Sequence, residues 1–236
     1  MQNGSLQAIS GGLVVSCQAG PESPLNAPHF IAALAQSAER GGCVGFRVDR
    51  PENIRAVRAV SRLPIIGINK IPHPDSNVYI TPTFASAKAA VDAGADIVAL
   101  DATDRPRPGG EPVAEIIRRV REELGTPVMA DIGSFEDGMR AAEAGADIIA
   151  TTLAGSPPYG HGESGPALDL ARRLVAECGK LVIIEGQVWT VDDVKACFST
   201  GVHAIIVGSS ITVPEFITRR FVRVTPRGAA GTGGRA

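Results

Sequence analysis

Lys70 ends a short apolar segment, IIGINK at 65–70, whose other residues are typical of a buried strand. Lysine is seldom buried without a partner, so its amine needs a chemical or structural reason to be there. Burial and a neighbouring Arg47 would lower the pKa of this amine, and carboxylates of Asp131 and Glu185 would raise it. An amine tuned in this way can remove a proton from carbon, or attack a carbonyl to form a Schiff base. The alternative is a structural Lys70–Glu185 ion pair, which adds little stability by itself.

Polar side chains also stand at the ends of the other apolar segments of the chain. The set comprises two cations, three carboxylates and several neutral groups: Gln18, Arg47, Asn69, Lys70, Asp101, Asp131, Thr151, Thr152, Glu185, Ser209 and Ser210. A single polar residue at a strand end means little, since every strand must reach solvent somewhere. We expect the set to form one functional site if the fold brings these ends together.

Eight short apolar segments supply those ends. They lie at 11–17, 43–47, 64–70, 96–101, 127–132, 147–152, 180–185 and 203–208. Their apolar residues are nearly continuous instead of alternating with polar ones, as is typical of parallel strands buried on both faces. Segments with helical spacing lie between them, and this alternation of strand and helix indicates βαβ units.

An internal repeat indicates how the sheet closes. The segment VDAGADIVAL at 91–100 is nearly repeated as AEAGADIIAT at 142–151. A repeat of two strand–helix units predicts a single closed (β/α)8 TIM barrel with parallel strands. The alternative is an open doubly wound sheet, but no G-x-G-x-x-G motif follows the first strand. In a barrel the active site lies at the carboxyl ends of the strands, where the polar set would meet.

We expect one catalytic barrel domain over residues 11–222, preceded by an N-terminal extension at 1–10. The segment PEFITRRFV at 214–222 is expected to form the eighth helix of the barrel. The tail at 223–236 is rich in Gly and is expected to be disordered, as are roughly the first five residues.

Composition narrows the class of function. The net charge of −2 gives no reason to expect nucleic acid or a membrane as partner. No apolar run approaches the roughly 18 residues of a membrane span, and the N-terminus lacks the pattern of a secretory signal. These features predict a cytoplasmic protein. We expect its four cysteines to be buried thiols, and neither disulfides nor zinc ligands.

Gly-rich turns follow the seventh and eighth strands, EGQ at 185–187 and VGSS at 207–210. Barrels often bind phosphate there through backbone N–H groups at the start of a short helix. The expected phosphate-binding residues are Gly186, Gly208, Ser209 and Ser210. The loop at 101–111 is stiffened by prolines, and we interpret it as either a solvated loop or a lid or oligomer contact.

Nine motifs between about residues 11 and 222 carry a family resemblance: VVSCQA, GGCVGFR, IIGINK, VYITPT, ADIVALDATDRPRPGGE, MADI, ATTLAGSPPY, IIEG and VGSSIT. Together they resemble bacterial N-acetylmannosamine-6-phosphate 2-epimerases. The resemblance implies a TIM-barrel isomerase of sialic acid and amino sugar catabolism. It would interconvert N-acetylmannosamine 6-phosphate and N-acetylglucosamine 6-phosphate, with no cofactor and no metal.

The resemblance also implies roles for individual residues. Lys70 would be the acid/base at C2 of the sugar, and Glu185 its carboxylate partner. The residues that hold the sugar would be Gln18, Arg47, Asp131 and Thr152. C2 lies beside the C1 aldehyde of the open-chain sugar, so removing its proton gives an enolate, and reprotonation from the other face inverts the centre. Glu185 would also help open the ring by moving a proton between O5 and O1.

Four residues depart from the family pattern. Val213 stands where the family has an arginine, Gln187 where it usually has a basic residue, and Ser209-Ser210 where it has two glycines. Losing a cation beside a phosphate weakens binding, because charge-assisted hydrogen bonds are about twice as strong as neutral ones. Either serines and backbone N–H groups suffice, or Arg219 replaces the lost cation, or the substrate carries no phosphate.

Three interpretations of the function stay open. The chain is either the epimerase, or an enzyme in which Lys70 forms a Schiff base, or a non-catalytic barrel that binds a sugar phosphate. An epimerase acting on another sugar is a variant of the first. Barrels of this size often pair, so a homodimer is one expectation.

Overall fold

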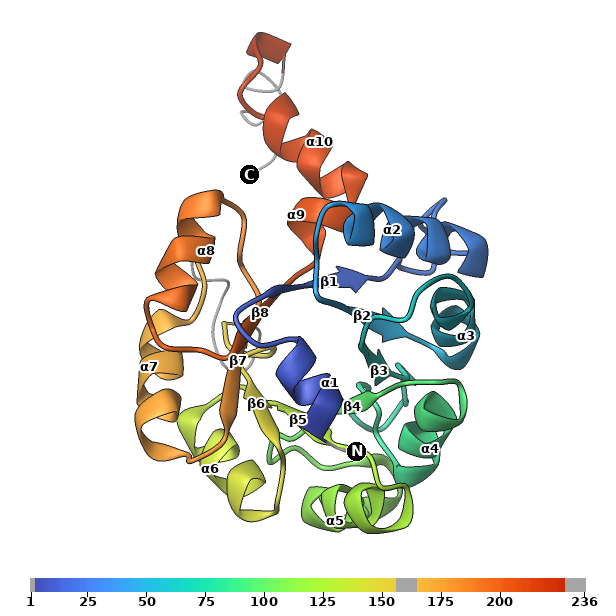
Figure 1. Ribbon diagram of the computed structural model, residues 1–236, viewed down its shortest axis with the longest axis vertical. Helices are drawn as coiled ribbons and strands as arrows, with labels where there is room; N and C mark the ends of the chain where they lie inside the picture. Colours follow the sequence, from blue (N-terminus) through green and yellow to red (C-terminus); the bar gives the residue numbers. More distant parts are fainter. Residues whose placement is uncertain (1–2, 156–164, 228–236) are drawn as a thin grey trace.

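The computed structural model describes residues 3–155 and 165–227 of the 236-residue chain. Eight strands form a closed barrel in the order β1 to β8, and every neighbouring pair is parallel, including β1 with β8. The strands are β1 (Leu13–Cys17), β2 (Gly45–Asp49), β3 (Ile65–Ile68), β4 (Ile97–Asp101), β5 (Val128–Asp131), β6 (Ile148–Ala150), β7 (Leu181–Glu185) and β8 (Ala204–Val207). The predicted (β/α)8 barrel is confirmed (Figure 1).

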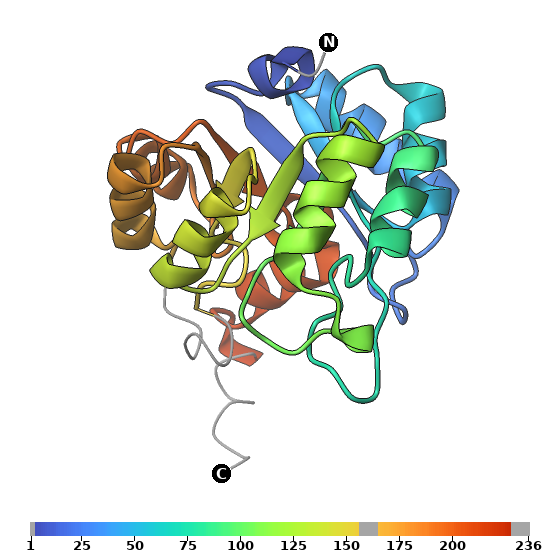
Figure 2. The same cartoon turned by 90° about the horizontal axis from the view of Figure 1, so that it is seen from below.

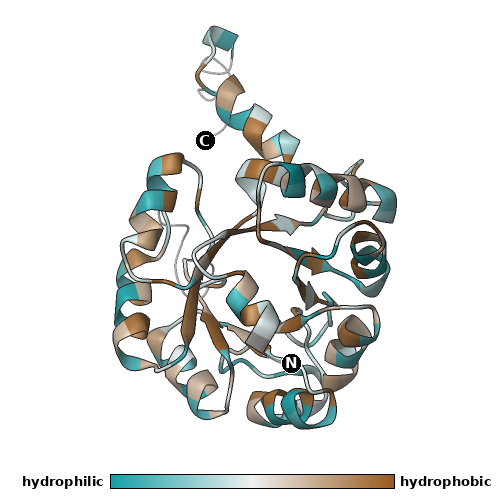
Figure 3. Cartoon of the chain, viewed as in Figure 1, coloured by the Kyte–Doolittle hydropathy of each residue, from teal (hydrophilic) through white to brown (hydrophobic). Residues whose placement is uncertain are grey.

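Helices surround the barrel and connect its strands. They are α2 (Pro28–Arg40), α3 (Pro51–Val60), α4 (Phe84–Asp92), α5 (Val113–Glu123), α6 (Phe135–Glu143), α7 (Leu168–Glu177) and α8 (Val191–Phe198). Their apolar sides pack against the strands, while polar residues face outward (Figure 3). No helix in the described part of the chain is long and apolar enough to span a membrane.

The internal repeat has a structural counterpart. Helices α4, α6 and α8 each begin with a capping box, at Thr83, Ser134 and Thr190 respectively. Such a box satisfies N–H groups that the first helical turn leaves without partners. Gly94 and Gly145, which follow α4 and α6, have φ of +107° and +98°, a conformation that favours glycine. The repeated glycines therefore mark the turn from helix to strand.

A short helix, α1 (Asn3–Ala8), covers the end of the barrel opposite the carboxyl ends of the strands (Figures 1 and 2). Ile9 behind it is fully buried in the cluster inside the barrel, and Leu6 packs against that cluster. The ring of His203 contacts the Leu6 carbonyl oxygen at 2.8 Å. The expected disorder of the first five residues is therefore wrong from residue 3 onward, because these apolar side chains close the barrel.

The C-terminal segment departs from the expected eighth barrel helix. A short helix, α9 (Ser209–Thr212), follows β8, and α10 (Pro214–Val222) then extends away from the barrel (Figure 1). The aromatic ring of Phe221 is largely exposed, as is Val224. The predicted disordered tail lies mostly outside the described residues. The four cysteines are buried free thiols, as expected.

Candidate active site

A cavity of about 670 Å³ opens at the carboxyl ends of the strands. Its walls come from the ends of β1, β2, β3, β7 and β8 and from the loops that follow them. Charged lining residues are Asp49, Arg50, Lys70 and Glu185, and aromatic ones are Tyr79 and Trp189. The size and mixed lining of this cavity are typical of a site for a small polar ligand.

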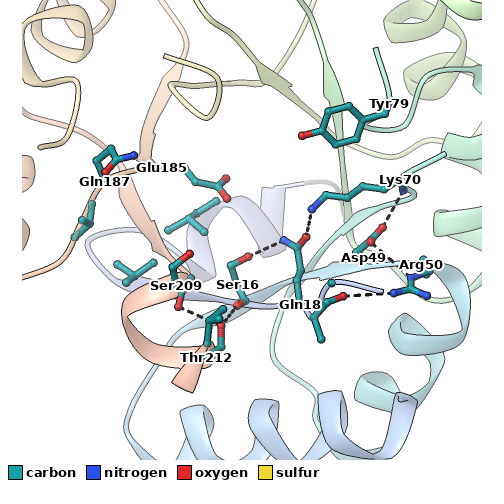
Figure 4. Close-up of a pocket in the computed structure, with 18 of the residues that line it drawn as sticks. Ser16, Gln18, Asp49, Arg50, Lys70, Tyr79, Glu185, Gln187, Ser209 and Thr212 are labelled. Carbon is teal, nitrogen blue, oxygen red and sulfur yellow. Dashed lines mark hydrogen bonds and ion pairs between the residues drawn. The ribbon is translucent and has the colours of Figure 1, made fainter. Parts of the chain in front are cut away.

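Lys70 enters the cavity from the β3 side and is held at both ends (Figure 4). Its backbone N–H donates to Asp49 Oδ1 at 2.8 Å, and its Nζ donates to Gln18 Oε1 at 2.6 Å. Gln18 Nε2 in turn donates to Ser16 Oγ at 2.7 Å. Burial lowers the pKa of the amine, the charge of Asp49 raises it and that of Arg47 lowers it, so the net direction is downward. A lowered pKa increases the share of the free-base form that proton abstraction requires.

Glu185 enters the cavity from the opposite wall, and its carboxylate points toward Lys70 (Figure 4). Its Oε2 lies 2.7 Å from Arg47 Nη1 and 3.2 Å from the Thr152 hydroxyl. Burial raises the pKa of Glu185 to about 7, although the charge of Arg47 opposes that shift. A carboxyl group with this pKa can both donate and accept a proton near neutral pH. The alternative Lys70–Glu185 ion pair is not formed, because Glu185 pairs with Arg47 instead.

Arg47 and Asp131 form a layer beneath Glu185. The Arg47 guanidinium donates two bonds to Asp131, at 2.9 and 2.7 Å, and both side chains are almost completely buried. The Thr152 hydroxyl lies 2.6 Å from Asp131 Oδ1. These contacts fix the position of the Glu185 carboxylate from behind. A bidentate guanidinium–carboxylate pair is well suited to that purpose because its geometry is planar and rigid.

The structure thus brings the predicted residues together, but in two layers. Those that line the cavity are Gln18, Lys70, Glu185, Gly186, Gly208 and Ser209. Arg47, Asp131 and Thr152 lie behind Glu185 and not in the cavity wall. The Ser210 hydroxyl is also turned away from the cavity and donates to the Val188 carbonyl oxygen at 2.9 Å. Asp101 is buried and bonded to Thr103 and Arg105.

Replacing Arg47 by Met is expected to destabilise the fold by about 3–5 kcal/mol, because it leaves buried carboxylates without their cation. Urea unfolding, followed by circular dichroism, would measure this change. The matched control is Arg118→Met, since Arg118 forms exposed ion pairs on α5 that should contribute little to stability. Equal losses in the two variants would contradict the supporting role of Arg47.

Sequence reasoning missed several residues of the cavity. Asp49 and Arg50 were overlooked because the second strand was expected to end at Arg47, whereas β2 continues to Asp49. Side chains alternate along a strand, so Arg47 and Asp49 share one face, and Asp49 reaches the mouth. Arg50 has φ of +74°, rare for a residue with a side chain. Tyr79 lies in the VYITPT motif, but the presence of a tyrosine there did not by itself indicate that it lines the site.

Among the described residues, the β7–β8 side of the cavity carries no cation. Gln187, Trp189 and Val213 line it together with the start of α9, and none of the described cavity residues on this side is a Lys or Arg. Close packing positions this wall, since a Cβ at Gly208 would meet Ser16 Cβ at 3.1 Å. The expectation that Arg219 replaces the lost cation finds no support in its contacts. Arg219 pairs with Glu215 and lies over the Phe216 ring.

Comparisons with known proteins identify one protein family. Residues 31–226 match the model of a family described as "Putative N-acetylmannosamine-6-phosphate epimerase". A Synechococcus elongatus protein named "Putative N-acetylmannosamine-6-phosphate 2-epimerase" is 46% identical over 219 residues, 92% of this chain and 94% of the relative. A Clostridioides difficile protein of the same name is 42% identical over 92% of this chain and 97% of its own. The solved N-acetylmannosamine-6-phosphate 2-epimerase from Clostridium perfringens superposes with a TM-score of 0.90 at 34% identity, covering 93% of this chain and 96% of that one.

Proposed function

The chain belongs to the N-acetylmannosamine-6-phosphate epimerase family, and we propose that it is an isomerase that inverts C2 of N-acetylmannosamine 6-phosphate to give N-acetylglucosamine 6-phosphate. This is the activity of an N-acylglucosamine-6-phosphate 2-epimerase, and its place is in sialic acid and amino sugar catabolism. The observation that carries the proposal is the pair of Lys70 and Glu185, which face each other across one cavity (Figure 4).

Lys70 is the base in this proposal. The open-chain sugar places its C1 aldehyde beside C2, so the free amine of Lys70 takes the C2 proton and the electron pair moves onto the carbonyl oxygen as an enolate. Glu185, in its acid form, returns a proton to the opposite face of C2 and becomes a carboxylate. The reverse reaction uses the same two groups in exchanged roles. Burial lowers the pKa of Lys70, which favours the free amine, and raises that of Glu185 to about 7, which favours the protonated carboxyl.

The other predicted residues support these two groups. Gln18 lines the cavity beside the Lys70 amine, and we assign it contact with the sugar as the enolate forms. Arg47, Asp131 and Thr152 act through Glu185, whose carboxylate they orient. Before proton transfer, Glu185 moves a proton between O1 and O5 to open the ring.

The phosphate lies at the β7–β8 side of the cavity. Gly186, Gly208 and Ser209 line this side, and the first N–H groups of α9 have no partner within that short helix. Ser210 contributes its backbone, because its hydroxyl is bonded to Val188.

Turnover itself tests the proposal. The protein is incubated with N-acetylmannosamine 6-phosphate, and proton NMR follows the appearance of N-acetylglucosamine 6-phosphate. Saturable binding without any product would favour the non-catalytic sugar-phosphate barrel instead. A substrate adduct trapped on Lys70 by borohydride would favour the Schiff-base enzyme.

A second candidate substrate is the unphosphorylated or another N-acetylhexosamine. The observation that favours it is the lack of a cation among the described residues of the β7–β8 wall, where Gln187 and Val213 replace the cations of the family pattern. The same NMR measurement with N-acetylmannosamine decides between the two. A kcat/KM at least as high as that for the phosphorylated sugar would identify the unphosphorylated sugar as the substrate.

We also propose that the chain pairs as a homodimer and acts in the cytoplasm. The support for pairing is α10, which extends from the barrel and leaves Phe216 and Phe221 exposed (Figure 1). Exposed apolar side chains on a protruding helix are typical of a contact with a partner. Four buried free thiols suit a reducing compartment.

A further inference from the structure

The β7–β8 wall of the cavity has no cation among its described residues, which raises the question of what neutralises a phosphate there. A sugar phosphate carries between one and two negative charges at neutral pH, and phosphate sites in proteins usually include an Arg or Lys. The two cations among the described cavity residues, Arg50 and Lys70, belong to the β2 and β3 sides. Arg50 is also engaged, since its Nη2 donates to Asn26 at 2.6 Å.

One further cation lies against a residue of this wall. The guanidinium of Arg220, on α10, stacks over the indole ring of Trp189 with its carbon 4.3 Å from the ring centroid. Trp189 itself lines the cavity, and its indole Nε1 donates to Gln187 at 3.4 Å. The guanidinium is therefore in contact with a side chain that forms part of this wall.

The contacts of Arg220 leave its charge available. Stacking on an aromatic face uses the plane of the guanidinium and leaves the N–H groups at its edge free to bind an anion. Within the described part of the chain, Arg220 forms no ion pair. Its charge lowers the pKa of Asp193, whose Oδ2 already accepts the backbone N–H groups of Trp189 and Thr190, at 2.9 and 2.8 Å.

The neighbouring Arg219 has an ion-pair partner and a different aromatic contact. Arg219 pairs with Glu215 one turn away on the same helix and lies over Phe216 instead of Trp189. The two arginines therefore offer the same charge on the same helix, but only one of them lies against a cavity residue.

We propose that Arg220 binds the phosphate group of the substrate and supplies the cation that Gln187 and Val213 do not. The inference rests on the proposed function of the cavity as a site for a phosphorylated sugar. In the free protein Trp189 holds the guanidinium at the edge of the wall, and rotation of the Arg220 side chain past the indole edge carries its N–H groups to the phosphate. Helix α10 then becomes part of the substrate site.

Arg220→Gln and the matched control Arg219→Gln test this role. Arg220→Gln should raise the KM for N-acetylmannosamine 6-phosphate about 10- to 100-fold, since hydrogen bonds to a charged group contribute about 1.5–3 kcal/mol. Its kcat should change less than about threefold, because the residue does not touch C2. Arg220→Lys should recover part of the loss, and Arg219→Gln should match the wild type. An Arg220→Gln KM equal to that of Arg219→Gln would overturn the proposal.

Binding of inorganic phosphate, measured by calorimetry, separates this inference from the proposed function. Arg220→Gln should weaken that binding about tenfold or more, and Arg219→Gln should not. If the wild-type protein binds phosphate through Arg220 but converts no sugar phosphate, the proposed function fails and the anion site stands. If the sugar phosphate is converted and phosphate binds equally to both variants, the role of Arg220 fails alone. A fall in melting temperature in Arg220→Gln, with unchanged phosphate binding, would mark a structural role and also overturn it.

Discussion

Lys70→Met is expected to lower kcat by about 10²- to 10⁴-fold, the range that a positioned acid–base group contributes. Methionine keeps most of the length of the apolar stem, so it removes the amine with little change in packing. Without the amine, the site loses the group to which we assign removal of the proton from C2. The hydrogen bond from Nζ to Gln18, at 2.6 Å, also disappears.

The control for this variant is Lys88→Met. Lys88 lies on α4 and forms an exposed ion pair with Asp92, far from the cavity lining. This change should leave kcat unaltered and cost at most about 0.5 kcal/mol of stability. Steady-state kinetics by NMR or a coupled assay measure both variants. Near-normal turnover by Lys70→Met would show that the proton transfer does not depend on this amine.

Glu185→Gln should also reduce kcat by about 10²-fold or more, and it should change the shape of the pH profile. At a pH below the pKa values of both Lys70 and Glu185, both groups carry protons and neither can act as base. Activity should therefore rise as the pH increases through about 7, the pKa to which burial raises Glu185. It should fall again at higher pH, when both groups have lost their protons.

Glutamine keeps the shape of Glu185 and its bonds to Arg47 but cannot titrate. The rise near pH 7 should therefore be absent from the residual activity of Glu185→Gln. A sugar phosphate has its own second pKa near 6, so any titration that remains near that pH belongs to the substrate. Glu122→Gln, on the exposed face of α5, serves as the control. A variant profile that retains the rise near pH 7 would contradict the assignment to Glu185.

Much of the fold followed from local patterns. Continuous apolar segments and the repeated helix–Gly–strand turn predict the barrel, because each pattern depends only on neighbouring residues and on burial of both strand faces. Lys70 and Glu185 could be placed at the mouth for the same reason. Helix α1, over the opposite end of the barrel, was not predicted, because only Leu6 and Ile9 in a short polar segment indicate it.

The depth of each side chain in the barrel was harder to predict. Because β2 runs two residues further than expected, Arg47 lies one layer deeper in the barrel and Asp49 lies at the mouth. Segment boundaries read from apolar runs do not resolve such a shift, because Val48 and Asp49 continue the strand past a charged residue. The approach of Arg220 to Trp189 depends on where α10 leaves the barrel, which no local pattern specifies.

The central claim is that Lys70 removes the proton from C2. Its most direct test is the reaction of the wild-type protein with N-acetylmannosamine 6-phosphate in D₂O, followed by NMR at C2. We predict deuterium at C2 of the N-acetylglucosamine 6-phosphate product, and no exchange at C2 with Lys70→Met. Product that forms without deuterium, or exchange that persists in Lys70→Met, would contradict the claim.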